Sequence, residues 1–348
     1  MPLTDFNLSR CPVANPNNNF TSCLYYDDIG PNICGFCKRP EYYRCLASNL
    51  QIPLSHSSVQ DFLSCHHLYY LKAIRGIQIK PPATSTPIKL GSLWDAVLQK
   101  QAGVTVDIPG LINSYQISDR DVAKIKALFR AYKQLGISPE PDGILQSKIN
   151  LSIKFEQRWT PDYPDTIQVT GYYDRKYPNH FVENKLSGRP DNYSDPWFIN
   201  SQVGTYFLAD QSLEHCIMEV CRTPDLKSTG QYKDELDEEY GERVFQDIIS
   251  RPSHYFIGWN NKDHTYGKKF YRAEFNLEEL ANRFVHIMRE IHQARLFNGW
   301  YKNDKVCNNI LPGITCDFAG ICKYNNMSEE RYGIRDKPIV FQLPLDIF

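Results

Sequence analysis

The chain has 348 residues, enough for one large domain or two modest ones. Its 39 Lys and Arg residues nearly balance 40 Asp and Glu residues, which excludes a uniformly basic coat for nucleic acid but allows a local basic groove. No apolar run approaches the roughly 18 residues needed to cross a bilayer, and residues 1–10 lack the basic-then-apolar pattern of a signal peptide. We therefore expect a cytoplasmic protein.

The eleven cysteines are clustered, and five of them lie in the first 45 residues. Because the cytosol keeps thiols reduced, such clustering predicts metal centres rather than disulfides. This N-terminal stretch is rich in Asn, Pro, Gly and Cys and has no sustained periodicity. We predict that it binds zinc, with Cys34 and Cys37 as a knuckle-like pair and Cys23 and Cys45 as the other ligands. Cys11 is a further candidate, and free thiols are the alternative.

The rest of the chain alternates helical and strand patterns. Residues 118–135 predict the clearest early helix, because Ser118 and Asp121 form a capping-box-like start and apolar residues follow at spacings of three and four. Further helices are predicted from Ser57 and at 91–101, 197–212, 232–249 and 276–297. Strands are predicted at 151–155, 167–171, 180–185 and 216–221. This order predicts an α/β fold in which helices flank a mixed central sheet.

Three residues in the second and third strands form a candidate catalytic centre. Asp174 ends Gly-Tyr-Tyr-Asp, and Glu183 and Lys185 follow as Glu-Asn-Lys. Strand side chains alternate between faces, so Glu183 and Lys185 share one face, and a hairpin brings Asp174 opposite Glu183. Two such carboxylates are a typical Mg²⁺ site beside phosphate, and the lysine could orient a water or stabilise developing charge. The alternative is three solvated surface residues.

Gln202 and Tyr206 are spaced i and i+4, so they share one face of the helix after this hairpin. Gly-x-x-Asp, Glu-x-Lys and Gln-x-x-x-Tyr, in this order, resemble the RecB-like branch of the PD-(D/E)XK nucleases. The segments Leu54–Tyr70 and Gly91–Asp95, together with Arg222-Thr-Pro and the stretch from Glu242 to Pro252, resemble other parts of this family and its phage-type members. The likeness covers roughly residues 54–325.

The resemblance implies a restriction-endonuclease-like core and a Mg²⁺- or Mn²⁺-dependent DNA nuclease. The RecB-like branch further implies an exonuclease that acts in recombination, repair or phage DNA metabolism, encoded by a bacterium or a phage. The DNA would be single-stranded or have a free end, and a recombination or replication protein could be a partner. The chain would then comprise a Cys-rich, zinc-binding segment at residues 1–50 and a nuclease domain at 51–348. A nuclease fold that binds DNA with weak or no catalysis is the alternative.

Asp95 is a departure from the family pattern. The resemblance implies a metal-binding His four residues after Gly91, where this chain has Asp95. A carboxylate could still bind Mg²⁺ or Mn²⁺ through oxygen, which would make Asp95, Asp174 and Glu183 the metal ligands. Alternatively, Asp95 is a surface residue or alters the metal preference.

Four later cysteines resemble the [4Fe–4S] site of the AddB-type and CRISPR-associated RecB-like nucleases. Cys65 stands near the opening helix, and three cysteines follow close together near the C-terminus: Cys307, Cys316 and Cys322. The resemblance implies that the cluster closes the nuclease domain by tying its two ends together. A zinc site, a core thiol at Cys65 and a redox sensor are the alternatives.

The remaining candidates are DNA contacts and core cysteines. Cys216 and Cys221 lie in an apolar strand, which predicts core thiols. Trp94 could stack on bases or belong to the core. The candidate phosphate contacts, each also readable as a solvated charge, are Arg75, Lys89, Arg175, Lys176, Arg189 and Arg222.

Overall fold

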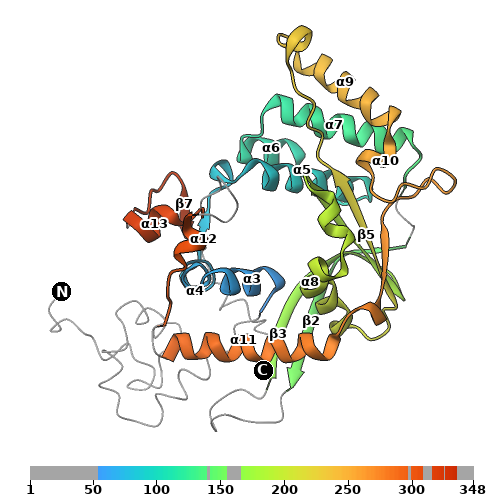
Figure 1. The fold of residues 1–348 in the computed structure, drawn as a ribbon. Coiled ribbons are helices and arrows are strands. Elements are labelled where there is room, and N and C mark those ends of the chain that lie inside the picture. The colour runs from blue at the N-terminus through green and yellow to red at the C-terminus, as the bar shows by residue number, and fades with distance from the viewer. Residues whose placement is uncertain are drawn as a thin grey trace.

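A five-stranded mixed sheet forms the centre of the molecule (Figure 1). The computed structural model describes residues 54–138, 142–154, 166–296, 299–308, 316–324 and 326–334. The predicted zinc segment, with Cys11, Cys23, Cys34, Cys37 and Cys45, lies outside the described residues. None of the described helices combines the length and the apolar character that a membrane crossing requires.

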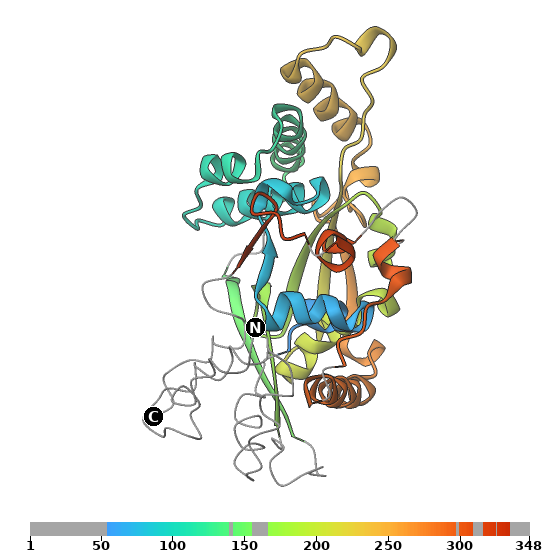
Figure 2. The same ribbon diagram turned by 90° about the vertical axis from the view of Figure 1, so that its left-hand side faces the viewer.

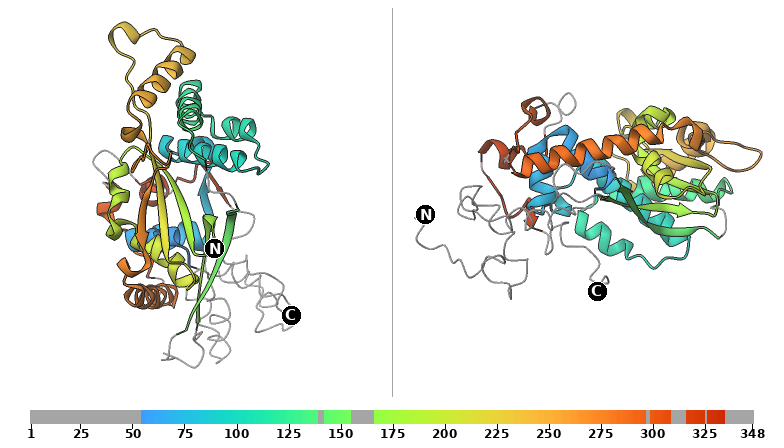
Figure 3. Two further views of the ribbon diagram at one scale, coloured as in Figure 1. Left: turned by 90° about the vertical axis from the view of Figure 1, so that its right-hand side faces the viewer. Right: turned by 90° about the horizontal axis from the view of Figure 1, so that it is seen from below.

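The strands lie in the order β2-β3-β4-β5-β6, and only β4 and β5 run parallel. Their bounds are β2 (Ile144–Lys154), β3 (Thr166–Lys176), β4 (His180–Ser187), β5 (His215–Arg222) and β6 (Lys268–Tyr271). β2 pairs with β3 along most of its length, whereas β3 pairs with β4 only at Arg175–Val182 and Lys176–Phe181. The β2–β3 hairpin therefore extends beyond the rest of the sheet (Figures 2 and 3).

One face of the sheet is covered by helices from two parts of the chain (Figure 1). They are α5 (Thr86–Gln101), α6 (Ile108–Tyr115), α7 (Asp119–Gln134), α9 (Asp237–Ser250) and α10 (Pro252–Tyr255). Trp94 on α5 and Tyr132 on α7 pack edge to face, with ring centroids 6.0 Å apart, above the buried Cys221 of β5. Such burial of large aromatic side chains is the main source of stability for this layer.

The opposite face is covered by α3 (His56–Ser64), α8 (Pro196–Ala209) and α11 (Leu277–Leu296). Phe62 of α3 and Phe284 of α11 pack against Val169 of β3. α8 lies on the sheet beside them, with Phe207 fully buried against Phe181 of β4. This layer matters for function because α3 and α8 lie over the strands that carry the candidate catalytic residues.

Segments from the two ends of the described chain meet in a small subassembly. α4 (His66–Tyr69), a π-helical turn and β1 (Ile77–Ile79) lie beside α12 (Asp304–Asn308), α13 (Ala319–Tyr324) and β7 (Tyr332–Ile334). β1 and β7 form a two-stranded antiparallel sheet, seen in Figure 1 where the cyan and red ribbons meet. Leu71, Phe318 and Tyr332 are buried between them.

The predicted α/β fold with a mixed sheet flanked by helices is confirmed. Ser118 caps α7 as predicted, accepting a hydrogen bond from the Asp121 backbone N–H at 3.2 Å. The helix α6 was not predicted, because its eight residues include a proline and a glycine and are too short for a clear period. The first half of β2 was also missed, because its outward positions carry exposed residues such as Ile144, which breaks the alternation.

Candidate active site

Glu183 and Lys185 point from β4 to the same face, as strand alternation requires. Lys185 Nζ lies 2.5 Å from Glu183 Oε1, and the Glu183 side chain is only 2% exposed. Burial raises the pKa of Glu183, although the charge of Lys185 opposes this. Burial lowers the pKa of Lys185, but Glu183 and Asp174 outweigh burial and raise it. The centre thus contains a buried ion pair whose lysine stays charged.

Asp174 lies opposite Glu183, because the neighbouring residues Arg175 and Val182 pair between β3 and β4. Asp174 Oδ2 accepts a hydrogen bond from the backbone N–H of Asn184 at 2.8 Å. Burial raises the pKa of Asp174, while the positive charge of Lys185 lowers it. The hairpin therefore brings the three predicted residues Asp174, Glu183 and Lys185 together.

Gln202 and Tyr206 reach the same centre from α8. Gln202 Nε2 donates to Glu183 Oε1 at 2.5 Å and to the Tyr206 hydroxyl oxygen at 3.1 Å. Glu183 Oε1 therefore has two donors, Lys185 and Gln202. Glu183 Oε2 is buried and has no hydrogen-bond partner among the described residues. A buried carboxylate oxygen without a donor is costly, which leaves a coordination position for a cation.

Asp95 approaches from α5 and is half-buried. Its Oδ2 accepts a hydrogen bond from Gln99 Nε2 at 2.7 Å. Burial and the negative charge of Asp174 raise the pKa of Asp95 to about 6. Asp95 and Asp174 line one pocket, together with Gln146 and Asn184. The residue that stands where the family pattern has His is therefore a neighbour of Asp174 rather than a remote surface residue.

These carboxylates are not arranged as a ready metal site. Between Leu54 and Ile334, as far as the structure describes them, no three His, Cys, Asp or Glu side chains could hold a metal ion as they stand. Each acid is instead held by a protein donor: Asp95 by Gln99, Asp174 by Asn184, and Glu183 by Lys185. The orphaned Glu183 oxygen and the raised pKa values of the acids are both relieved by a divalent cation. The donors are all oxygen atoms, which are the ligands that Mg²⁺ and Mn²⁺ prefer.

His56, at the start of α3, adjoins the centre. Its Nδ1 lies 3.0 Å from Ser201 Oγ, and Ser201 directly precedes Gln202 on α8. Burial, together with the charges of Lys185 and Arg283, lowers the pKa of His56 to about 4. His56 therefore lies between two cations, one in the candidate centre and one on α11.

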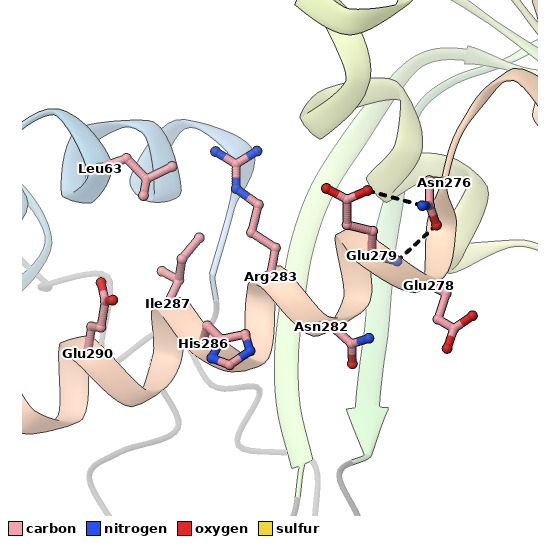
Figure 4. A pocket seen from close by; sticks show the side chains of 9 residues that line it. All are labelled: Leu63, Asn276, Glu278, Glu279, Asn282, Arg283, His286, Ile287 and Glu290. Carbon is pink, nitrogen blue, oxygen red and sulfur yellow. Dashed lines mark hydrogen bonds between the residues drawn. The ribbon is translucent and has the colours of Figure 1, made fainter.

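Arg283 is exposed and lines an open pocket between α3 and α11. Figure 4 shows its side chain extending from α11 toward the helix that carries Leu63. The same pocket is lined by Glu278, Glu279 and Glu290, so most of it does not favour an anion. Arg283 is the pocket residue whose charge reaches His56.

The four later cysteines come together where the ends of the described chain meet. Burial raises the pKa values of Cys307, Cys316 and Cys322, and charge interactions among these thiols and Cys65 raise them further. The Cys316 backbone N–H also donates to the Cys307 carbonyl at 3.4 Å. Four thiols are the donor set that a tetrathiolate site requires, although as they stand no three His, Cys, Asp or Glu side chains among the described residues could hold a metal ion.

The predicted DNA contacts differ in their exposure to solvent. Arg175 lines the same pocket as Asp95, but it is only 5% exposed and forms an ion pair with Glu219, so its prediction as a phosphate contact is wrong. Trp94 is 1% exposed and belongs to the core. The predicted core thiols Cys216 and Cys221 are fully buried. The other five candidates lie at the surface, exposed or half-buried: Arg75, Lys89, Lys176, Arg189 and Arg222.

Three residues of the site escaped the sequence analysis. Gln99 and Gln146 are polar residues in a helix and a strand, and no motif marks them. His56 lies in the opening segment that resembles the family, but its proximity to Lys185 depends on how α3 packs against α8. A helical period marks which face is buried, but not which other helix that face meets.

Comparison with known proteins agrees with this geometry. No curated protein matches the chain. The family model for the PD-(D/E)XK nuclease superfamily matches residues 53–323, which include every described candidate residue from Asp95 to Cys322. Because this match covers most of the chain, the chain belongs to the PD-(D/E)XK nuclease superfamily.

Proposed function

We propose that the chain is a Mg²⁺- or Mn²⁺-dependent deoxyribonuclease in which Asp95, Asp174 and Glu183 bind the cation. The observation that carries this proposal is the buried Glu183 Oε2, which lacks a hydrogen-bond partner within the described part of the chain. Such an atom is rare in a purely structural ion pair, because burial without a partner destabilises it. A bound divalent cation would polarise the scissile phosphate as a Lewis acid.

Lys185 has a distinct role in this proposal. It donates to Glu183 Oε1, and its raised pKa keeps it charged at neutral pH. In this proposal the ammonium group of Lys185 would turn toward the phosphate and stabilise negative charge that develops in the transition state. Gln202 keeps Glu183 oriented by its 2.5 Å hydrogen bond, and Tyr206 in turn accepts from Gln202.

The substrate we propose is DNA that is single-stranded or has a free end, cleaved as an exonuclease. The RecB-like order of Asp174, Glu183, Lys185, Gln202 and Tyr206 supports this choice, as does the contact among the last four. Recombination, repair or phage DNA metabolism would be the setting, with a recombination or replication protein as a possible partner. Arg283 is the cation that we assign to a backbone phosphate next to the scissile one, because it is exposed and close to His56.

We also propose that Cys65, Cys307, Cys316 and Cys322 bind a [4Fe–4S] cluster that joins the two ends of the domain. The charges of all four thiols affect one another, which supports one shared site. The resemblance to the AddB-type nucleases supports iron–sulfur over zinc at this site. The proposed role is structural, because these thiols are not among the contacts of the candidate catalytic centre.

A cleavage assay with purified protein and labelled DNA tests the proposed function. We expect Mn²⁺- or Mg²⁺-dependent release of nucleotides from linear single strands, and resistance of the same sequence when circular. Asp174→Ala and Lys185→Ala should each abolish cleavage, while Lys148→Ala, an exposed change on β2, should not. Circular dichroism shows whether each variant is folded.

The alternative of a nuclease fold that only binds DNA makes the opposite expectation. Wild-type protein would then bind DNA without cleaving it under any divalent cation. Cleavage at the wild-type rate by folded Asp174→Ala or Lys185→Ala would equally overturn the assignment of this centre. Cutting of circular DNA would retain the nuclease and replace the exonuclease with an endonuclease.

A further inference from the structure

The alternation of side chains between the two faces of the sheet is interrupted at one point in β2 and β3, next to Asp174. Residues two apart on a strand normally share a face. On β3, however, Tyr173 packs against Tyr206 of α8, while Arg175 lies on the other side with Glu219 and near Tyr132 of α7. Asp174 lies between them, so the side-chain alternation of β3 is interrupted at this residue.

The side-chain alternation of the paired strand β2 is interrupted at the same place. On β2, Ile149 packs in the α8 layer, whereas Leu145 lines the pocket beside Tyr132. The pairs Leu145–Arg175 and Ser147–Tyr173 are both in register, which leaves Gln146 opposite Asp174. Gln146 and Asp174 do not pair with each other, so the regular pairing of β2 with β3 is interrupted at this one position.

Gln146 has an unusual backbone conformation at the point where the alternation of β2 is interrupted. Its φ is 49°, in the left-handed region that residues other than Gly, Asn and Asp rarely adopt. A glutamine in this region inside a strand is strained, and such strain persists where surrounding structure imposes it, most often at functional sites. The exposed neighbour Lys148, by contrast, has an ordinary negative φ.

The Gln146 side chain also reaches the candidate centre. It lines the pocket with Asp95, Asp174 and Asn184. Its amide interacts with the Asp174 carboxylate as a hydrogen-bond donor. Asp174 is therefore held from two strands, by the Asn184 backbone N–H of β4 and by the Gln146 amide of β2.

We propose that Gln146 is a positioning residue for the cation site: its left-handed backbone turns Asp174 toward Asp95 and Glu183, and its amide orients the Asp174 carboxylate. This inference rests on the proposed function, because it assigns Gln146 to the same cation. Hydrogen-bond partners of metal ligands typically change metal affinity or activity by about 10–100-fold when they are removed. Gln146 acts through Asp174.

Two substitutions separate the backbone from the amide. Gln146→Gly removes both the strain and the amide, whereas Gln146→Leu keeps the strain and loses only the amide. In metal-free protein the midpoint of thermal unfolding of Gln146→Gly should therefore exceed that of Gln146→Leu by about 2 °C. Both variants should bind Mn²⁺ about tenfold more weakly in calorimetric titration and need more Mn²⁺ for half-maximal cleavage. The matched control Lys148→Gly should lower the midpoint and leave Mn²⁺ binding unchanged.

The outcomes distinguish this inference from the proposed function. Wild-type protein that binds Mn²⁺ and cleaves DNA, with both Gln146 variants binding Mn²⁺ equally well, overturns the role of Gln146 alone. A Gln146→Gly protein that is no more stable than Gln146→Leu overturns the strain. Wild-type protein that neither binds Mn²⁺ nor cleaves DNA overturns the proposed function, and the role of Gln146 with it.

Discussion

Lys185 and Glu183 form an ion pair within one strand, with Lys185 Nζ 2.5 Å from Glu183 Oε1, that satisfies only one of the two carboxylate oxygens. A purely structural pair at this depth would be expected to satisfy both oxygens, because each buried acceptor without a donor destabilises the fold. The incomplete pair supports the proposed metal site, at which Glu183 Oε2 would bind the cation. Burial raises the pKa of Glu183 to about 7, and the charge of Lys185 limits this rise.

The first prediction concerns this pair. Lys185→Met removes the partner of a carboxylate that is 2% exposed, so the free energy of unfolding at pH 8 should fall by about 3 kcal/mol. Adding Glu183→Gln to Lys185→Met should recover most of this loss, because no uncompensated charge then remains. Urea denaturation measures both values, and neither protein should cleave DNA. A double variant no more stable than Lys185→Met would mean that Glu183 carries no uncompensated charge once the lysine is removed.

The sequence predicted the central residues of this site because strand and helix periods are local. Glu183 and Lys185 share a face through strand alternation, and Gln202 and Tyr206 share a face through the helical turn. The position of Asp174 opposite Glu183 follows from the hairpin that joins β3 to β4. These relations are local and do not depend on how the rest of the chain packs, so they can be predicted from one sequence.

The parts that were missed or wrong depend on how distant elements pack. Arg175 follows Asp174 and was predicted as a phosphate contact, but it is buried at the pocket wall, where it forms an ion pair with Glu219. Gln146 lies in an exposed strand with no distinguishing neighbours, and only its backbone conformation and its position opposite Asp174 reveal it. Its φ depends on tertiary structure and has no signature in residue type.

The second prediction is a pH dependence caused by Asp95. Its pKa is raised from the usual 3.8 to about 6 in the fold, so folding favours its protonated form. This contribution to stability is complete below about pH 4 and is lost as the pH rises through about 6. Asp95→Asn, which cannot ionise, should therefore gain stability relative to cation-free wild type over this interval and keep the gain at pH 8.

Urea denaturation at pH 4, 5, 6 and 8 without divalent cations measures this difference. Exposed Asp234→Asn serves as the control and should show no such pH-dependent gain. Excess Mn²⁺ should reverse the order at pH 8, because only wild type has all three carboxylates. A constant difference between Asp95→Asn and wild type from pH 4 to pH 8 would contradict the burial of an ionisable Asp95.

The third prediction concerns the metal preference. Asp95→His places the residue expected from the family pattern next to Asp174. Imidazole is a softer ligand than carboxylate and suits Mn²⁺ better than Mg²⁺. We expect Asp95→His to retain cleavage with Mn²⁺ and to lose most of its cleavage with Mg²⁺, while wild type uses both. The ratio of the two rates in one assay measures this, and an unchanged ratio would remove Asp95 from the ligand set.

The fourth prediction concerns the cysteine cluster. Anaerobically purified wild-type protein should be brown, with a broad absorbance band near about 400 nm and bound iron. Cys316→Ser should lose iron and lower the midpoint of thermal unfolding, because the two ends of the domain are no longer tied together. Cys221→Ala removes a fully buried thiol elsewhere and should keep its iron. A colourless wild-type protein that contains zinc would replace the iron–sulfur assignment with a zinc site.

The fifth prediction concerns Arg283 and is best measured in an Asp174→Ala background, where DNA stays intact. If Arg283 contacts one backbone phosphate, Arg283→Ala should weaken binding of a labelled single-stranded oligonucleotide. It should also reduce the slope of log affinity against log salt concentration by about 0.7, the value for one phosphate contact on a single strand. Exposed Lys126 on α7 carries the same charge away from α3, so Lys126→Ala should leave both quantities unchanged. An equal slope for Arg283→Ala and its parent would show that the phosphate path avoids α11, in agreement with the glutamates that line most of that pocket.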